Sequence, residues 1–150
     1  MISEGVRRFH VGDRMSEMAI HHGTVYLAGQ VAEDATQDVR GQTRQVLAAV
    51  DRLLLEAGTD NAHILRAEIY LADMADFAAM NEIWDDWVAP GDAPPRATVQ
   101  ARLPEDSCLA RPVSCEQRLS RHGSERRRIS ALLHARTCVR SRSARRHDAR

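Results

Sequence analysis

Residues 39–58 read VRGQTRQVLAAVDRLLLEAG, and this stretch has the pattern of a long amphipathic helix. Asp34 and Gln37, three residues apart, predict a capping box at its start, and Gly58 predicts its end. Its apolar residues recur at steps of three and four, which places them on one side of a helix: Val39, Thr43, Val46, Leu47, Val50, Leu53 and Leu54. A helix with one apolar side is expected to pack on a β-sheet.

The segments around this helix predict the sheet. Strands are expected at 7–10, 15–21, 24–31, 63–72 and 96–103, with a second helix at 76–88, and Gly29 indicates a bulge or close backbone approach within the third strand. The order predicts an α+β domain in which a mixed sheet has two helices on one face.

Two of these strands alternate between apolar and polar residues, which predicts their faces. In 63–72, Leu65, Ala67, Ile69 and Leu71 point one way and Arg66, Glu68 and Tyr70 the other. In 96–103, the residues predicted to face the core are Ala97, Val99, Ala101 and Leu103, with Arg96, Thr98, Gln100 and Arg102 on the other face. On the second helix the apolar side is predicted to hold Phe77, Met80, Ile83, Trp84 and Trp87.

The composition of the chain changes after residue 106. All 21 basic residues are arginine and they balance 21 acidic residues, but residues 1–106 carry a net charge of −9 and residues 107–150 carry +9. The second part holds all three cysteines and no aromatic residue, and Pro112 interrupts its one candidate strand, at 108–119. We therefore predict a domain over 1–106 and an arginine-rich, mostly disordered tail over 107–150, with no clear final strand.

Several stretches of the first part resemble the RidA (YjgF-type) family of reactive-intermediate deaminases. They are GTVYLAGQV, QTRQVLAAVDRLLLEAG, LRAEIYLADM, DFAAMNEIWDDWV and PPRATVQARLPED, which follow one another in the order found in the family, over residues 14–106. The resemblance implies a chorismate-mutase-like α+β fold and a homotrimer with ligand sites between subunits. It also implies hydrolysis of reactive enamines and imines to 2-oxo acids and ammonia, without a cofactor. The resemblance ends where the composition changes, and a reading-frame change near Ser107, testable in the coding DNA, would explain both.

Arg96 is the main candidate for binding a substrate. An arginine that follows two prolines at the start of a strand presents a planar fork suited to a carboxylate, and the resemblance places the carboxylate-binding arginine of the family at this position. The alternative is a surface arginine paired with an acid such as Glu68 or Asp92. Either arrangement satisfies the charge, so the sequence leaves both open.

The resemblance implies further substrate-binding positions, at which this chain departs from the family. Thr98 stands where many members have cysteine, Ala28 precedes Gly29 where many have serine, and Met15 corresponds to a common tyrosine. Many active members carry a glutamate on the last strand, which should begin near residue 109. The acid nearest to that position, Glu116, matches neither the spacing nor the apolar neighbours, so the catalytic residue is unassigned.

These departures leave more than one function open. The first is hydrolytic deamination of small 2-imino or enamine acids, and the second is binding of a small carboxylate without catalysis. Endoribonuclease activity, attributed to some relatives, is less favoured because no nuclease-like acid–base pair is evident.

Other partners and sites are not favoured by the sequence. His21 and His22 with Cys108, Cys115 and His122 match no standard zinc spacing, so no metal is expected. The tail has no aromatic residue to stack on bases and is expected to bind nucleic acid only non-specifically. No apolar run approaches the ~20 residues of a membrane span, and the first ten residues lack a secretory pattern, so a cytoplasmic protein without membrane contact is expected.

Overall fold

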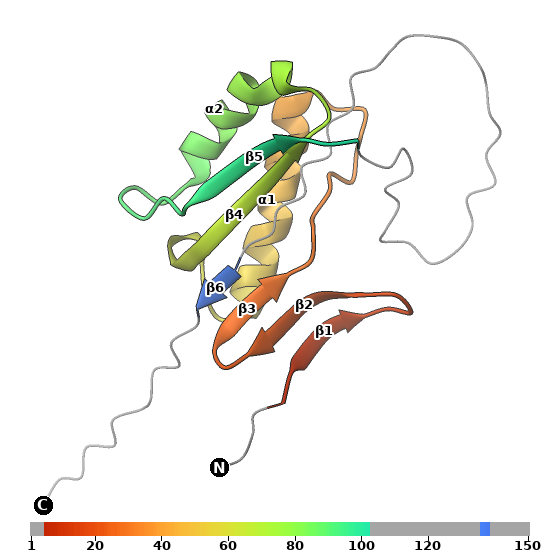
Figure 1. The fold of residues 1–150 in the computed structure, drawn as a ribbon, viewed down its shortest axis with the longest axis vertical. Coiled ribbons are helices and arrows are strands. Elements are labelled where there is room, and N and C mark those ends of the chain that lie inside the picture. The colour runs from red at the N-terminus through yellow and green to blue at the C-terminus, as the bar shows by residue number, and fades with distance from the viewer. Residues whose placement is uncertain (1–4, 103–135, 139–150) are drawn as a thin grey trace, which may run out of the picture.

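The computed structural model describes residues 5–102 and 136–138. One mixed sheet of six strands has two helices on one face (Figure 1). The strands are β1 (Arg7–Val11), β2 (Ser16–His21), β3 (Thr24–Leu27), β4 (Ile64–Leu71), β5 (Arg96–Gln100) and β6 (Arg136–Cys138), and the helices are α1 (Val39–Glu56) and α2 (Phe77–Trp87). Single 3₁₀ turns, η1 (Asn61–His63) and η2 (Met74–Asp76), precede β4 and α2. The α+β class, the mixed sheet and the placement of both helices confirm the prediction.

The strands lie in the order β1-β2-β3-β6-β4-β5. β1, β2 and β3 form an antiparallel meander, β6 is antiparallel to both β3 and β4, and β5 is parallel to β4. The β3–α1–β4 and β4–α2–β5 connections therefore each place a helix on the sheet between two parallel strands.

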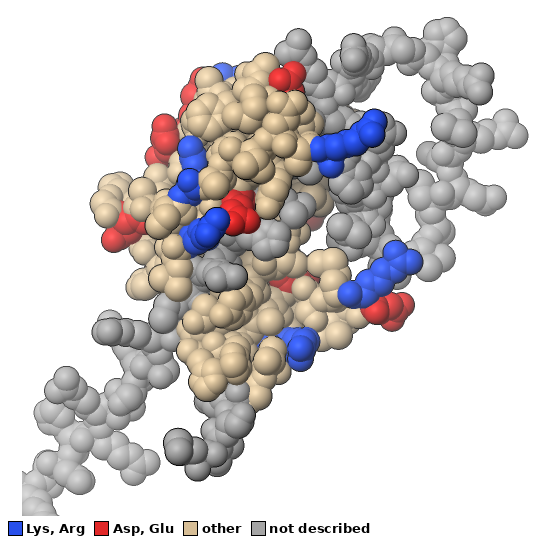
Figure 2. All heavy atoms as spheres, in the orientation of Figure 1, with Lys and Arg blue, Asp and Glu red and all other residues tan. Residues whose placement is uncertain are grey.

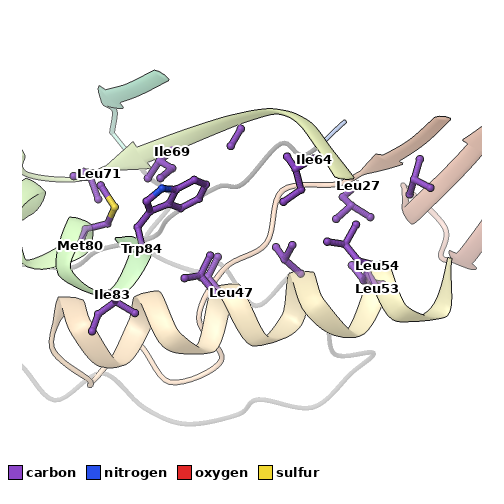
Figure 3. Packing of buried hydrophobic residues seen from close by; sticks show 14 of the residues in the cluster. Leu27, Leu47, Leu53, Leu54, Ile64, Ile69, Leu71, Met80, Ile83 and Trp84 are labelled. Carbon is purple, nitrogen blue, oxygen red and sulfur yellow. The ribbon is translucent and has the colours of Figure 1, made fainter. Parts of the chain in front are cut away.

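The core lies between the helices and the sheet. All seven residues of the predicted α1 stripe are buried, and Figure 3 shows Leu47, Leu53 and Leu54 directed from α1 towards the sheet. On α2, Met80, Ile83 and Trp84 are buried as predicted, whereas Phe77 is 36% exposed. The stripe on α1 thus fixes how the longest element lies on the sheet.

The sequence predicted the end of α1 correctly but not its start. Gly58 has φ of 80° and ends the helix as expected, with Thr59 N–H donating to Leu54 O at 2.9 Å. The predicted start of the helix is wrong by one turn. The N-cap is Asp38, whose side chain accepts a hydrogen bond from Gly41 N–H at 2.8 Å. Asp34 instead holds a separate turn before the helix, accepting from the Gln37 side chain at 2.9 Å.

Three strand predictions need correction. β3 ends at Leu27, so Gly29 follows the strand rather than lying within it. In β4, Ile64 is buried and Leu65 is 50% exposed, since the pairing with β6 is irregular between Ile64 and Arg66. The remaining alternation of β4 is as predicted.

The third correction concerns the faces of β5. Ala97 and Val99 are exposed, whereas Arg96 and Thr98 are half-buried, which is the reverse of the predicted facing. The β4–β5 register explains it, because Arg96 pairs with the buried Ala67 and therefore lies on the side covered by the helices. The strand also stops at Gln100, short of the predicted 103.

The final strand was not predicted from the sequence. β6 has three residues, too few to show an alternation, yet it occupies the position between β3 and β4. Residues 136–138 lie within the part of the chain, 107–150, that is predicted to be mostly disordered. The rest of that tail lies outside the described residues.

Candidate functional site

Arg96 begins β5 and lies against α2. Pro95, directly before it, accepts a hydrogen bond from Ala67 N at 3.0 Å and so already follows the edge of β4. The pairing of Arg96 with Ala67 turns the arginine side chain towards the helix layer. The two prolines therefore deliver a guanidinium group into the space between the sheet and α2, where it is half-buried.

Two side chains of α2 hold this guanidinium group. Its carbon lies 4.9 Å from the centroid of the Trp84 ring, and its Nη2 donates to Asn81 Oδ1 at 2.7 Å. The predicted alternative, a surface arginine paired with Glu68 or Asp92, is wrong. Glu68 instead binds Arg66 at 2.6 Å on the other face of the sheet and accepts from Tyr70 at 3.2 Å.

The other terminal nitrogen of Arg96 has no such partner. Nη1 is buried and forms no hydrogen bond with any residue that the structure describes. Burial lowers the pKa of the Arg96 guanidinium, and the charge of Asp85 on α2 acts in the opposite direction. Arginine stays protonated in proteins nonetheless, so the site contains a partly buried positive charge with an available donor.

Thr98 adds a second polar atom to the same region. It lies two residues after Arg96 on the same side of β5, and its Oγ1 is also buried without a partner among residues 5–102 and 136–138. Alternate residues of a strand are about 7 Å apart. Buried polar atoms without partners are uncommon, so these two atoms mark this side of β5 as a candidate binding site for a polar ligand.

The other predicted binding residues lie elsewhere in the sheet. Met15 precedes β2 and is 40% exposed. Ala28 follows β3 and donates its backbone N–H to Glu17 O at 2.8 Å, and Gly29 comes next. In the strand order, β3 is three positions from β5, or about 14 Å at the usual spacing. A single chain therefore brings Arg96 and Thr98 together but leaves Met15, Ala28 and Gly29 apart from them.

Asn81 and Trp84 were not predicted to belong to the site. Trp84 was predicted on the apolar side of α2, which is correct since it is 5% exposed, but its ring also supports Arg96. The available signal was their spacing of three residues on α2, which puts both on one side of that helix. This spacing alone could not identify the site, because the sequence pattern predicted the wrong side of β5 for Arg96.

The histidines and cysteines considered as metal ligands lie partly within the described residues and partly outside them. The rings of His21 and His22 contact each other at 4.1 Å between centroids. In the part of the chain that the structure describes, no group of three or more potential ligands comes together. Cys108, Cys115 and His122 lie outside that part, as do residue 109 and Glu116.

Comparison with known proteins gives the family. A protein-family model described as Endoribonuclease L-PSP matches residues 7–108, about two thirds of the chain. This chain belongs to that family, the RidA/YjgF family.

Individual members of the RidA/YjgF family are similar over the same region. A RutC family protein of Haemophilus ducreyi is 50% identical over 98 residues, which cover 65% of this chain and 84% of that protein. The RutC family protein YoaB of Escherichia coli K12 is 48% identical over 90 residues, covering 60% and 78%.

Solved structures similar to this chain have the same fold. NMB1025 of Neisseria meningitidis, a member of the YjgF family, superposes with a TM-score of 0.72 at 37% identity and covers 92% of this chain and 98% of its own. An uncharacterized protein from Pseudomonas aeruginosa gives 0.74 at 34% identity, covering 91% and 100%. Neither α1 nor α2, nor any other described helix, has the length and apolar character needed to cross a membrane.

Proposed function

We propose that the protein hydrolyses small reactive 2-imino acids and their enamine tautomers to 2-oxo acids and ammonia. The observation that carries the proposal is the buried Nη1 of Arg96, which has no partner among the described residues and lies on the same side of β5 as the equally unpartnered Thr98 Oγ1. A carboxylate satisfies both atoms and neutralises the buried charge, which makes an anionic ligand the best match. The resemblance to RidA proteins supplies the reaction class.

The reaction needs little beyond binding and orientation. A 2-imino acid carries its carboxylate next to an electrophilic C=N carbon. When Arg96 holds the carboxylate, that carbon is fixed in place for attack by one water molecule. Water adds to the carbon, and the resulting carbinolamine collapses to the C=O of the 2-oxo acid as ammonia leaves with the transferred proton. An acid–base group would add about 10²–10⁴-fold.

We further propose that the site is completed between copies in a homotrimer. Arg96 and Thr98 of one copy would face the segment with Ala28, Gly29 and Met15 of another. This arrangement accounts for the separation of about 14 Å between β3 and β5 within one chain.

A second candidate function is binding of a small carboxylate without turnover. The observation in its favour is that the groups in hydrogen-bond or ring contact with Arg96, Asn81 and Trp84, cannot act as an acid or base near neutral pH. Met15 and Ala28 also lack the hydroxyl groups common in the family at these positions.

The test separates turnover from binding. An amino-acid oxidase generates 2-imino acids in the presence of semicarbazide, and an active deaminase lowers the rate at which the semicarbazone forms. Affinity for pyruvate, a small 2-oxo acid, is measured by calorimetry in parallel. Deamination supports the proposed reaction, and binding without deamination supports the second candidate.

Arg96→Ala is the decisive variant. A hydrogen bond between charged groups contributes about 1.5–3 kcal/mol, so its loss should weaken pyruvate binding by roughly 10- to 150-fold and lower turnover accordingly. Arg44→Ala, at an exposed position of α1, is the matched control and should bind as the unmodified protein does. If Arg96→Ala binds pyruvate with unchanged affinity, the carboxylate site is elsewhere.

A further inference from the structure

The side chain of Asn81 determines which part of the Arg96 guanidinium group remains available. We infer that Asn81 is a positioning residue that binds Nη2 of Arg96, so that Nη1 is left to bind the ligand carboxylate, with the Trp84 ring as the supporting surface. This inference rests on the proposed function, because it concerns the same carboxylate site. The inference explains why position 81 holds an amide side chain, which accepts a hydrogen bond from Arg96.

The contacts leave the guanidinium group few orientations. Trp84 is 5% exposed and packed into the core between α2 and the sheet, where Figure 3 shows its ring beside Met80 and Ile69. The guanidinium carbon of Arg96 lies 4.9 Å from the centroid of this fixed ring, so the ring blocks movement of the guanidinium group on one side. The hydrogen bond of 2.7 Å to Asn81 Oδ1 then fixes rotation within the remaining plane. Nη1 is left buried without a partner among the described residues.

The chemistry of the amide is suited to this role. Asn81 Oδ1 is a neutral acceptor, so it satisfies Nη2 without cancelling the positive charge that a carboxylate ligand requires. An aspartate at the same place would form an ion pair with the guanidinium and compete with the ligand for it. A leucine of similar size would accept no hydrogen bond and leave the guanidinium free to rotate.

Two substitutions at this position test the inference in the full-length protein. Asn81→Asp should weaken pyruvate binding by at least 10-fold while leaving the melting temperature equal or higher, because the new carboxylate binds Arg96 itself. Asn81→Leu should weaken binding by about 5- to 10-fold. Asp86→Asn, at an exposed position of the same helix, is the control and should change neither quantity.

A double-mutant cycle distinguishes a positioning role from a general structural one. If Asn81 acts through Arg96, Asn81→Leu should cause no further loss of pyruvate affinity in the Arg96→Ala protein. In NMR spectra of the unliganded protein, separate Nη–H resonances of Arg96 should be visible and should merge in Asn81→Leu, since the guanidinium then rotates freely.

The outcomes separate this inference from the proposed function. An unmodified protein that neither binds pyruvate nor deaminates imines overturns the proposed function. A protein that binds pyruvate normally, with Asn81→Asp and Asn81→Leu equal to it, overturns the positioning role and leaves the carboxylate site intact. Additive losses in the double-mutant cycle also overturn the positioning role.

Discussion

At the scale of single residues, the apolar and polar residues of β5 face the opposite sides from those that their pattern predicts. Arg96 and Thr98 are half-buried while Ala97 and Val99 are exposed, although a rule that buries apolar residues predicts the reverse. Burying a hydroxyl or a charge without a partner costs stability in the free protein. Such a cost is typical of a binding site, where the ligand satisfies the buried groups.

Thr98→Val tests this cost directly. Valine has the same shape without the hydroxyl, so the free protein should become more stable by about 1 kcal/mol in urea unfolding, because an unsatisfied buried group costs about 1–3 kcal/mol. Pyruvate affinity should fall at the same time, by about 5-fold, since one donor to the carboxylate is lost. A variant that loses stability without losing affinity would show that the hydroxyl is satisfied inside the protein and does not contact the ligand.

The candidate site was predictable from sequence only in part. Arg96 was identified because the Pro-Pro-Arg motif is local and its chemistry is distinctive. Asn81 was not, because its role depends on contact between α2 and β5, residues that are 15 positions apart in the chain. A polar residue on a helix is ordinarily assigned to solvent, and only the three-dimensional structure shows that Asn81 faces an arginine.

At the scale of elements, long periodic segments were predicted well and short or irregular ones were not. The α1 stripe and the stop at Gly58 are confirmed, because 18 residues give the period many repeats. The Asp34–Gln37 pair satisfies the capping-box pattern but stabilises a separate turn, since Asp38 competes for the same role. β6 is three residues long, and its position follows from pairing with β3 and β4 rather than from its own sequence.

The two helices are joined by an ion pair that makes a prediction about pH. Arg40 of α1 donates to both carboxylate oxygens of Glu82 of α2, at 2.7 and 2.9 Å. These hydrogen bonds lower the pKa of Glu82 below its ordinary value of 4.5. A lowered carboxyl pKa stabilises the folded state at pH values above 4.5, and this stabilisation is lost as the pH falls through the folded-state value.

Glu82→Gln should therefore be less stable than the unmodified protein at pH 7, with a difference that shrinks as the pH falls below 4.5. Urea unfolding at a series of pH values measures it. Glu33→Gln, at an exposed position before α1, is the control and should follow the unmodified protein throughout. A difference for Glu82→Gln that stays constant down to about pH 3 would mean that the carboxylate charge is not the source of the stabilisation.

At the scale of the whole molecule, the sheet has one face covered by helices and one that is not. Tyr26 and Val99, 41% and 44% exposed, lie on the second face, together with Ala97. In Figure 2, which views the molecule from this side, most of the described residues are neither acidic nor basic, but charged side chains interrupt the surface. The Arg66–Glu68 ion pair of β4 lies on the same face. Exposed apolar side chains such as Tyr26 and Val99 are candidates for a contact between proteins. The separation of Met15, Ala28 and Gly29 from Arg96 is the observation behind the proposal that a second copy completes the site.

Val99→Asp tests whether assembly and binding depend on this face. Light scattering should give the unmodified protein a mass of three times 16.8 kDa and the variant 16.8 kDa, because burying an unpaired carboxylate in an interface is costly. Pyruvate affinity should fall together with the mass even though Arg96 and Thr98 are unchanged, while far-ultraviolet circular dichroism stays the same. Leu55→Asp, at an apolar position 78% exposed on α1, is the control and should remain trimeric. A Val99→Asp protein that is monomeric yet binds pyruvate normally would show that one chain holds the complete site.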